Sequence, residues 1–280
     1  MGDSVIRYYD AASEREWARL DRGWIEFAVN LHFITAAIPP GGRVLDLGAG
    51  PGRYAIALAG RGHRVHVGDL SPEQVRLARE KIAAAGVDVA GRIEAVEELD
   101  ARDLRGLADA SFDAVLALGP FYHLQAEADR RRAAGEIARV LRPGGVACVA
   151  FMPRPAFLTV ALLEPERWPP LDDPAGLAPF WESGRFDHTE PGRFTGAWFA
   201  RVEEIAPLFA SAGIDEIRTV ASEGIASWLS ERDWARIRER GPAAVDQVVS
   251  IVIATAEDRS IPGMSTHLLY IGRKSGGAEQ

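Results

Sequence analysis

The sequence predicts an α/β fold, a doubly wound and mostly parallel sheet with helices on both faces. Short apolar runs alternate with helical stretches between residues 43 and 152, as strands and helices do in a wound sheet. The composition agrees, because 47% hydrophobic and 26% charged residues are typical of a folded globular chain. A length of 280 residues fits one large domain with insertions or two small domains.

The elements of this core follow one another along the chain. Strands are expected at 43–48, 64–68, 92–96, 112–118 and 146–151, and helices at 52–60, 72–85 and 127–141. The helix at 72–85 has the clearest start. Ser71 is a good N-cap, Pro72 suits the first helical position, and Gln74 completes a capping box.

Segments outside this core predict further parts of the molecule. Apolar residues at spacings of three and four predict an amphipathic N-terminal helix: Trp17, Leu20, Trp24, Phe27, Leu31 and Ile34. Residues 153–200 hold eight of the 23 aromatic residues, which indicates an insertion with its own packing. A helix to 212, strands at 214–220 and 267–271 and a helical block at 225–257 follow. We therefore expect a helical lid over 1–40, an α/β core over 41–152, an aromatic-rich cap insertion over 153–200, and the rest of the core over 201–280 with a helical insertion at 225–257.

Charge, cysteine content and hydropathy exclude several classes of function. A net charge of -8 and a pI near 5.4 disfavour nucleic acid and anionic lipid as partners. A single cysteine, Cys148, cannot build a disulfide framework or a thiolate metal site, so no metal is expected. No apolar run reaches the roughly 18 to 20 residues that span a bilayer, and no signal peptide pattern is present, so a cytoplasmic location is expected.

A glycine-rich loop follows the first predicted strand. It reads Asp46-Leu-Gly48-Ala-Gly50-Pro-Gly52, and glycines at such a turn let the backbone approach a ligand. A dinucleotide-binding fingerprint, GxGxxG, would need its third glycine at position 53, where this chain has Arg53. The loop also lacks the lysine of a phosphate-binding loop. The loop therefore predicts a cofactor site of another kind.

Three further motifs accompany this loop. The set is Val44-Leu-Asp-Leu-Gly-Ala-Gly-Pro-Gly52, Asp69 at the end of the second strand, Leu99-Asp-Ala-Arg-Asp-Leu104, and Leu118-Gly-Pro-Phe-Tyr-His123. In order and spacing these motifs resemble class I S-adenosylmethionine-dependent methyltransferases, over about residues 43 to 152. The resemblance implies the Rossmann-like fold of that family, with seven strands of which the last is antiparallel. It also implies S-adenosyl-L-methionine as cofactor and S-adenosyl-L-homocysteine as product.

The resemblance implies a cofactor contact for each motif. The methionine end would be held by Asp46, Gly48, Ala49, Gly50 and Gly52, the ribose by Asp69, the adenine by Leu70, Asp100 and Ala101, and the methyl-transfer edge by Leu118. A carboxylate suits a ribose, because its two oxygens can accept from two adjacent hydroxyls. Each assignment has an alternative. The glycines could serve only a tight turn between strand and helix, and Asp69 could merely precede the helix cap at Ser71. Asp103 could bind the adenine in place of Asp100.

Four aromatic or imidazole side chains are candidates for positions near the reaction. His123, with its neighbour Tyr122, follows the fourth strand and is the candidate base or acceptor-orienting group, with a structural histidine as the alternative. Tyr8 and Tyr9 are similar to N-terminal tyrosines that cover the cofactor in related enzymes, with plain helix packing as the alternative. His267 offers no specific signal.

The aromatic residues of the insertion have two interpretations. They either line an acceptor pocket or form the core of the insertion itself: Trp168, Phe180, Trp181, Phe186, Phe194, Trp198 and Phe199.

The motifs also limit the acceptor. The Asn/Asp-Pro-Pro-aromatic sequence of base amino-methyltransferases is absent after the fourth strand, and so is the Pro-Cys nucleophile of cytosine methylation. We therefore expect methyl transfer to oxygen, nitrogen or carbon of a small organic acceptor. The stretch after the fourth strand resembles a bacterial subgroup that includes enzymes of secondary metabolism. The alternatives are a cyclisation or rearrangement on the same cofactor and a non-catalytic binding protein. The sequence is compatible with a monomer and with a homo-oligomer.

Overall fold

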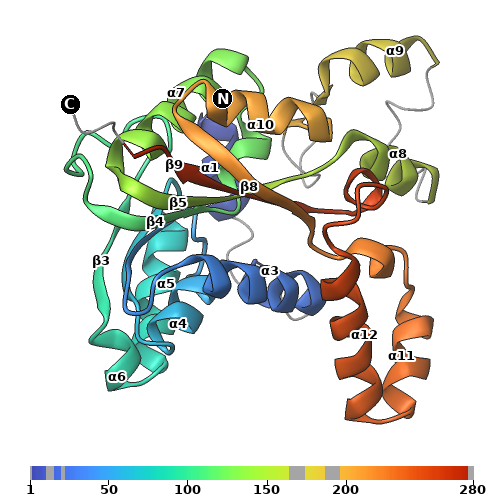
Figure 1. Ribbon diagram of the computed structural model, residues 1–280, viewed down its shortest axis with the longest axis horizontal. Coiled ribbons are helices and arrows are strands. Elements are labelled where there is room, and N and C mark those ends of the chain that lie inside the picture. Colours follow the sequence, from blue (N-terminus) through green and yellow to red (C-terminus); the bar gives the residue numbers. More distant parts are fainter. Residues whose placement is uncertain (1, 11–15, 20–22, 164–173, 187–195, 277–280) are drawn as a thin grey trace.

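A seven-stranded sheet forms the centre of the computed structural model, which describes residues 2–10, 16–19, 23–163, 174–186 and 196–276 (Figure 1). The strand order is β3-β2-β1-β4-β5-β9-β8. The strands are β1 Arg43–Leu47, β2 Arg64–Asp69, β3 Ile93–Glu98, β4 Phe112–Ala117, β5 Leu141–Phe151, β8 Ile214–Ala221 and β9 Leu268–Lys274. The five strands β1 to β5 are parallel to one another. Strand β9 runs antiparallel to both of its neighbours, β5 and β8. The predicted wound sheet with an antiparallel last strand is confirmed.

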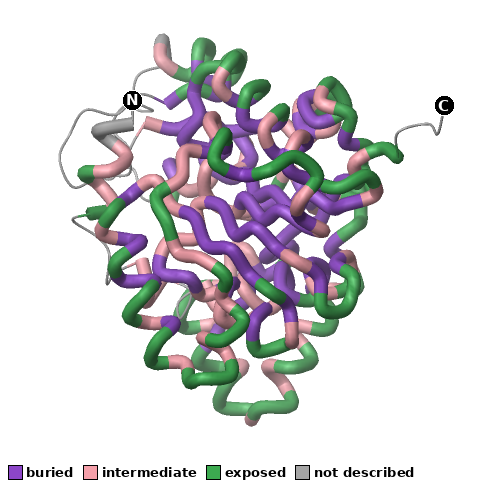
Figure 2. The backbone as a smooth tube through the Cα atoms, turned by 90° about the vertical axis from the view of Figure 1, so that its left-hand side faces the viewer, coloured by how far each residue is buried: buried purple, intermediate pink, exposed green. Residues whose placement is uncertain are grey.

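Helices cover both faces of the sheet. Successive side chains of each strand point to opposite faces and pack into two separate hydrophobic cores. Val44 packs with the helices of one face, whereas Leu45 packs with those of the other. The first face carries α3 Trp24–Ala37, α4 Arg53–Ala59, α5 Pro72–Ala84 and α12 Pro242–Thr255; the second carries α7 Glu127–Val140 and α10 Val202–Ala210. Figure 2 shows the buried strands inside a shell of exposed helix surface.

The N-terminal segment is divided, and the prediction of one amphipathic helix is wrong. It forms α1 Gly2–Asp10, a helical turn at 16–19 and then α3, which begins after Gly23. Gly23 lacks a side chain that could cap α3 and has a non-helical backbone, which explains the break. Leu20, one of the residues in the predicted apolar stripe, lies outside the described residues.

The start of α5 also differs from the prediction. Ser71 accepts from the backbone N–H of Gln74 at 3.1 Å, as an N-cap should. The Gln74 side chain does not return to Ser71, since its Nε2 donates to the carbonyl of Tyr9 at 3.0 Å. The backbone N–H of Ser71 donates instead to Asp69. Only one of the two hydrogen bonds of the predicted capping box therefore forms. The Gln74 side chain connects α5 to the N-terminal helix α1 instead.

Residues 153–200 form a small unit beside the sheet. Its described part comprises α8 Arg154–Leu163, α9 Pro174–Ser183 and a short hairpin of β6 Arg185–Phe186 and β7 Ala197–Trp198. Phe180, Phe186 and Phe199 pack around Phe157 in a core of their own. Trp198 belongs to the main core, and Trp181 is 40% exposed. The structure thus favours a packing role for Phe180, Phe186, Trp198 and Phe199 and not for Trp181. Trp168 and Phe194 lie outside the described residues.

Arg154 fixes this unit to the rest of the fold. Its guanidinium is 1% exposed and donates to both oxygens of Glu204, at 2.8 and 2.7 Å. It also donates to the carbonyls of Phe199, Trp181 and Glu182. Burial alone would lower the pKa of Arg154, and Glu204 opposes this without reversing it. One buried side chain therefore joins α8, α9, the residue after β7 and α10.

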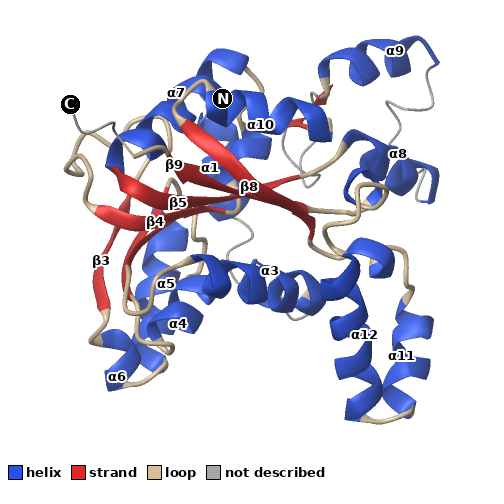
Figure 3. Cartoon of the chain, in the orientation of Figure 1, coloured by secondary structure: helices blue, strands red, loops and turns tan. Residues whose placement is uncertain are grey.

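The remaining described helices are short or lie outside the two helical layers. They are α6 Val87–Ala90, η1 Pro120–His123, η4 Gly224–Ala226, α11 Glu231–Glu239 and η5 Pro262–Met264. The pair α11 and α12 extends from the end of β8, where Figure 3 shows it on the opposite side of the sheet from α9. Within the part of the chain that is described, no helix is both long and apolar enough to cross a bilayer.

Candidate active site

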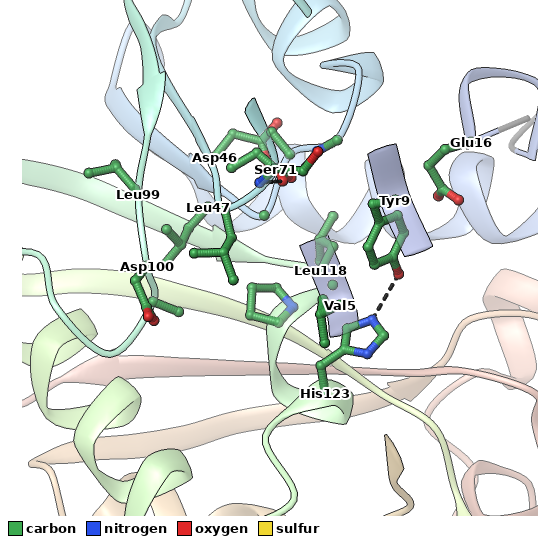
Figure 4. Close-up of a pocket in the computed structure, with 18 of the residues that line it drawn as sticks. Val5, Tyr9, Glu16, Asp46, Leu47, Ser71, Leu99, Asp100, Leu118 and His123 are labelled. Atoms are coloured by element: carbon green, nitrogen blue, oxygen red, sulfur yellow. Dashed lines mark hydrogen bonds between the residues drawn. The ribbon is translucent and has the colours of Figure 1, made fainter. Parts of the chain in front are cut away.

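A cavity lies at the C-terminal edge of the parallel strands, where wound-sheet proteins bind ligands. The loops after β1, β2, β3 and β4 form its walls, and α1 covers it. In Figure 4 Asp100 lies at one end, Tyr9 and Glu16 lie at the other, and Asp46 lies between them. The cavity is thus elongated and has carboxyl groups along its length.

The glycine loop forms the floor of this cavity. Gly48, Gly50 and Gly52 have φ of +68°, +54° and +85°, in the left-handed region that only glycine adopts readily. The N–H groups of Gly48 and Ala49 donate to the carbonyl of Gly68, which joins the loop to β2. A side chain at Gly50 would project toward Glu16 and Gln74 and would narrow the cavity. The loop therefore needs glycine for its conformation and for the space above it.

Asp69 closes the loop from the end of β2. Its carboxylate accepts from the backbone N–H of Gly50 at 2.7 Å and from that of Ser71 at 2.9 Å. Burial raises the pKa of Asp69 to about 6, although both N–H groups favour the charged form. A carboxylate with remaining acceptor capacity at the cavity wall is suited to bind vicinal hydroxyls.

Asp46 is the most deeply buried acid of the site. It is 2% exposed, and its Oδ2 has no hydrogen-bond partner among the described residues. Burial raises the pKa of Asp46 to about 7, and the nearby Asp69 adds to this effect, whereas the backbone of Ala55 opposes it. An unpartnered buried carboxyl oxygen is costly unless a ligand satisfies it. Asp46 therefore fits a ligand that carries a cationic or hydrogen-bond-donating group.

The loop after β3 supplies the opposite end of the cavity. Asp100 lines the cavity, and Asp103 pairs instead with the exposed Arg105 at 2.6 Å. The predicted preference for Asp100 thus agrees with its position. Its carboxylate, however, already accepts from Arg102 Nη2 at 2.6 Å and from the Arg102 backbone. Burial opposes the ionisation of Asp100, but these bonds outweigh it and lower its pKa. A ligand donor would share this carboxylate with Arg102.

Three side-chain contacts hold α1 over the cavity. A hydrogen bond of 2.8 Å joins the Tyr9 hydroxyl to His123 Nε2, as Figure 4 shows. Gln74 donates to the Tyr9 carbonyl, and Ser71 Oγ donates to Asp10. The covering helix is therefore attached to both the β2 loop and the β4 loop.

His123 is a poor proton acceptor in this arrangement. It is 7% exposed, and burial lowers its pKa to about 3, so the ring is neutral at physiological pH. Its Nε2 is occupied by Tyr9. Tyr122 lies beside it in the cavity wall, and burial holds the pKa of the Tyr122 hydroxyl above its ordinary value. The geometry suits a group that holds Tyr9 better than a base that is exposed to an acceptor.

Most of the residues that the sequence singles out come together at this cavity. Its lining includes Asp46, Gly48, Ala49, Gly50, Asp69, Leu70, Asp100, Ala101, Leu118, Tyr122, His123 and Tyr9. Two predicted cofactor residues do not line it. Gly52 is the N-cap residue of α4. The ring of Tyr8 packs edge-to-face with that of Tyr9, with 5.1 Å between the ring centroids.

The structure adds lining residues that the sequence analysis missed. Glu16 and Arg19 reach the cavity from the N-terminal segment, and Tyr54 reaches it from α4. Arg19 donates to Glu16 at 2.6 Å and to Glu26 at 2.9 Å. No sequence signal separates these charged residues from ordinary surface charge, because their placement depends on how the divided N-terminal segment folds back.

Comparison with known proteins agrees with this geometry. Residues 44–145 match a family model described as a methyltransferase domain. A ubiquinone biosynthesis O-methyltransferase of Xylella fastidiosa is 35% identical over 155 residues, which cover 51% of this chain and 60% of the relative. A ubiquinone/menaquinone biosynthesis C-methyltransferase of Geotalea daltonii is 32% identical over 162 residues, which cover 56% of this chain and 64% of the relative.

The fold also matches solved structures. A crystal structure of an S-adenosylmethionine-dependent methyltransferase from Methanosarcina mazei superposes with a TM-score of 0.59 at 18% identity, over 87% of this chain and 97% of that one. This likeness concerns the fold. The chain spans less than two thirds of the length of the curated relatives that it matches. Residues 44–145 are therefore a methyltransferase domain, whose four motifs lie around one cavity, and the fold is shared with S-adenosylmethionine-dependent methyltransferases.

Proposed function

We propose that this protein transfers the methyl group of S-adenosyl-L-methionine to oxygen, nitrogen or carbon of a small organic acceptor. The observation that carries the proposal is the pair of buried acids Asp46 and Asp69 beside the glycine loop. Asp46 presents an unpartnered oxygen, and Asp69 presents acceptor capacity at the cavity wall. These groups fit an elongated ligand that has a cationic end and a ribose.

Each end of the cavity has a matching role in cofactor binding. Asp46 would accept from the ammonium group of the methionine moiety, and Asp69 would accept from the ribose hydroxyls. Leu70 and the loop of Asp100 and Ala101 would hold the adenine. Arg19 provides a cation at the methionine end, where Glu16 and Glu26 orient its guanidinium. The cofactor supplies a methyl group on a sulfonium, which already has a good leaving group.

The protein therefore contributes alignment and exclusion of water rather than strong acid or base chemistry. Helix α1 covers the cavity, and its attachment through Tyr9 and His123 would close the site after the cofactor has entered. In this proposal His123 and Tyr122 are positioning residues. The acceptor would approach from the side of the unit at 153–200, which lies beyond the ends of β5 and β9.

The comparisons support a small acceptor. By their names, the matched relatives act in quinone biosynthesis, one at oxygen and one at carbon. The net charge of -8 also favours a small molecule over a nucleic acid. A role in secondary metabolism is part of the proposal and rests on the resemblance of the sequence after β4.

Isothermal titration with S-adenosylmethionine, S-adenosylhomocysteine and a nicotinamide dinucleotide tests the cofactor. We expect the first two to bind and the third not to bind. Asp69→Asn should weaken S-adenosylhomocysteine by about 2 to 3 kcal/mol, which is 30- to 150-fold. The exposed Asp88→Asn serves as the matched control. Binding of neither sulfur compound would refute the proposal. Formation of S-adenosylhomocysteine with a panel of phenols, amines and activated carbon acids then separates methyl transfer from a rearrangement.

A further inference from the structure

A second cluster of chemically competent side chains lies outside the cofactor cavity. Glu26 comes from the first turn of α3, Glu223 follows β8, and His267 precedes β9. Because β8 and β9 are antiparallel and pair Ala221 with Leu268, their ends bring Glu223 and His267 together. One donor atom from each of the three side chains lies within 4.8 Å of the others.

The donor atoms of the three side chains lie close together, and His267 and Glu223 are hydrogen-bonded to each other. His267 Nδ1 lies 2.7 Å from Glu223 Oε1 and 3.9 Å from Glu26 Oε2. The other oxygen of Glu223 accepts from the backbone N–H of His267 at 2.9 Å and from Ser265 Oγ at 3.3 Å. Hydrogen bonds that orient a carboxylate in this way are typical of the shell around metal ligands.

The charges of the cluster are incompletely balanced by fixed cations. Glu26 and Glu223 are 3% and 7% exposed. Arg19 is the cation bonded to Glu26, and it divides its guanidinium between Glu26 and Glu16. Burying carboxylates this close together is costly unless cations compensate them.

A separate observation points to a missing ligand partner beside Glu26. Asn30 lies one turn further along the same face of α3 and is fully buried. Its Nδ2 donates to the Tyr54 hydroxyl at 3.3 Å, but its Oδ1 has no partner among the described residues. A buried amide oxygen without a partner indicates a bound water or ion.

We propose that Glu26, Glu223 and His267 bind one divalent transition-metal ion, with an ordered water between that ion and Asn30. Two carboxylates and one imidazole favour Mn²⁺ or Zn²⁺ over Mg²⁺ and Ca²⁺, which prefer oxygen donors throughout. Metal bonds of about 2.0 to 2.2 Å place ligand atoms about 3 to 4 Å apart. The 3.9 Å separation of His267 Nδ1 from Glu26 Oε2 lies in this range, and the 2.7 Å hydrogen bond between His267 and Glu223 must open slightly. The ion binds His267 through Nδ1, which carries no proton in the metal complex. This site contains no thiolate, so the single cysteine does not exclude it.

The site lies at the same edge of the sheet as the cofactor cavity. β9 is two strands beyond β4, on the side of the proposed acceptor. Through Glu26 and Arg19 the cluster also connects the cavity lining to the end of β8. Neither the cofactor nor an acceptor is needed for the metal to bind, so the site can be tested independently of the proposed methyl transfer.

Titration of the chelator-treated full chain with Mn²⁺, followed by calorimetry and electron paramagnetic resonance, tests the proposal. We expect one tightly bound ion per chain. Glu223→Gln and His267→Gln should each weaken it by at least about tenfold, whereas Glu231→Gln, whose side chain is 82% exposed, should not. Affinity should rise with pH, because binding displaces a proton. Circular dichroism shows whether each variant is folded.

A nuclear magnetic resonance measurement on the unmodified chain tests the same site without any substitution, in case the variants unfold. Mn²⁺ broadens nuclear magnetic resonance signals of nearby nuclei, so the His267 ring should broaden before the rings of His32 and His63. Absence of binding at millimolar Mn²⁺ would overturn the proposal. So would binding that leaves the His267 signal unaffected, or equal affinity in folded Glu223→Gln, His267→Gln and unmodified chains. A protein that binds S-adenosylhomocysteine but not Mn²⁺ would refute the metal site alone.

Discussion

Gly48→Ala tests whether the cofactor loop depends on a close contact with the β4 loop. Gly48 has φ of +68°, and a Cβ built there would lie 2.6 Å from both Cδ and Cγ of Pro120. These ring atoms belong to the first residue of η1 and cannot rotate away as the end of a flexible side chain could. The added methyl group must therefore displace the backbone of one loop or the other.

Gly41 provides a matched control for this substitution. Its φ is also +68°, but a Cβ there would meet nothing within 4 Å. Alanine in the left-handed region costs about 1 to 2 kcal/mol at either position. Overpacking against Pro120 adds about 1 to 3 kcal/mol at Gly48 alone. The two variants should therefore differ by about 1 to 3 kcal/mol in their free energies of unfolding.

Urea unfolding of the two variants measures this difference, provided that their m-values agree. Titration with S-adenosylhomocysteine should show at least about tenfold weaker binding for Gly48→Ala and unchanged binding for Gly41→Ala. Equal destabilisation within about 0.5 kcal/mol would refute the reasoning, because it would mean that the Pro120 loop yields without cost.

Three further predictions concern buried polar groups. Asp46→Asn should stabilise the fold. Burial raises the pKa of Asp46 from an ordinary value of about 4 to about 7, so the folded protein must hold a costly buried charge above that pH. The free energy of unfolding of the parent therefore falls as the pH rises from about 4 to about 7. The gain, by urea unfolding at pH 8, should be about 2 to 4 kcal/mol, with weaker cofactor binding; parallel pH profiles of variant and parent would contradict this. Tyr9→Phe removes the hydrogen bond to His123, worth about 1 kcal/mol, and should speed S-adenosylhomocysteine release several-fold in stopped-flow; an unchanged rate would mean that α1 does not cover the ligand. Arg154→Met leaves Glu204 and three carbonyls without their donor and should lower the free energy of unfolding by about 3 kcal/mol, with cofactor affinity retained; a loss below about 1 kcal/mol would count against this role.

The core and its loops could be predicted because they depend on local patterns. The helix expected at 72–85 spans Pro72–Ala84, and the strand expected at 64–68 spans Arg64–Asp69. Asp46 and Asp69 stand at fixed offsets from strand ends, and parallel strands bring such positions to one edge. Their common location at the cavity therefore follows from alternation and turn chemistry.

Other parts of the site depend on contacts between distant segments. Gln74 looks like half of a capping box, but a backbone carbonyl of α1 competes for its side chain. His123 occupies the expected place after β4, yet burial keeps its ring neutral and its Nε2 is hydrogen-bonded to Tyr9. Glu26 and His267 are neighbours only because β9 is antiparallel, and neither carries a local signal. Periodicity within a segment contains no information about such partners.

The unit at 153–200 leaves and rejoins the core at one place. Ala200 N–H donates to the Met152 carbonyl, and Arg154 N–H donates to the Ala200 carbonyl, so the two ends of the unit are adjacent. Loop-closure entropy changes slowly with length when the ends are held together. Segments of different size and sequence can therefore be spliced between these positions while β5 and the cofactor loops keep their geometry. Under the proposed function, replacing this one segment would change which acceptor binds, while the cofactor site would stay the same.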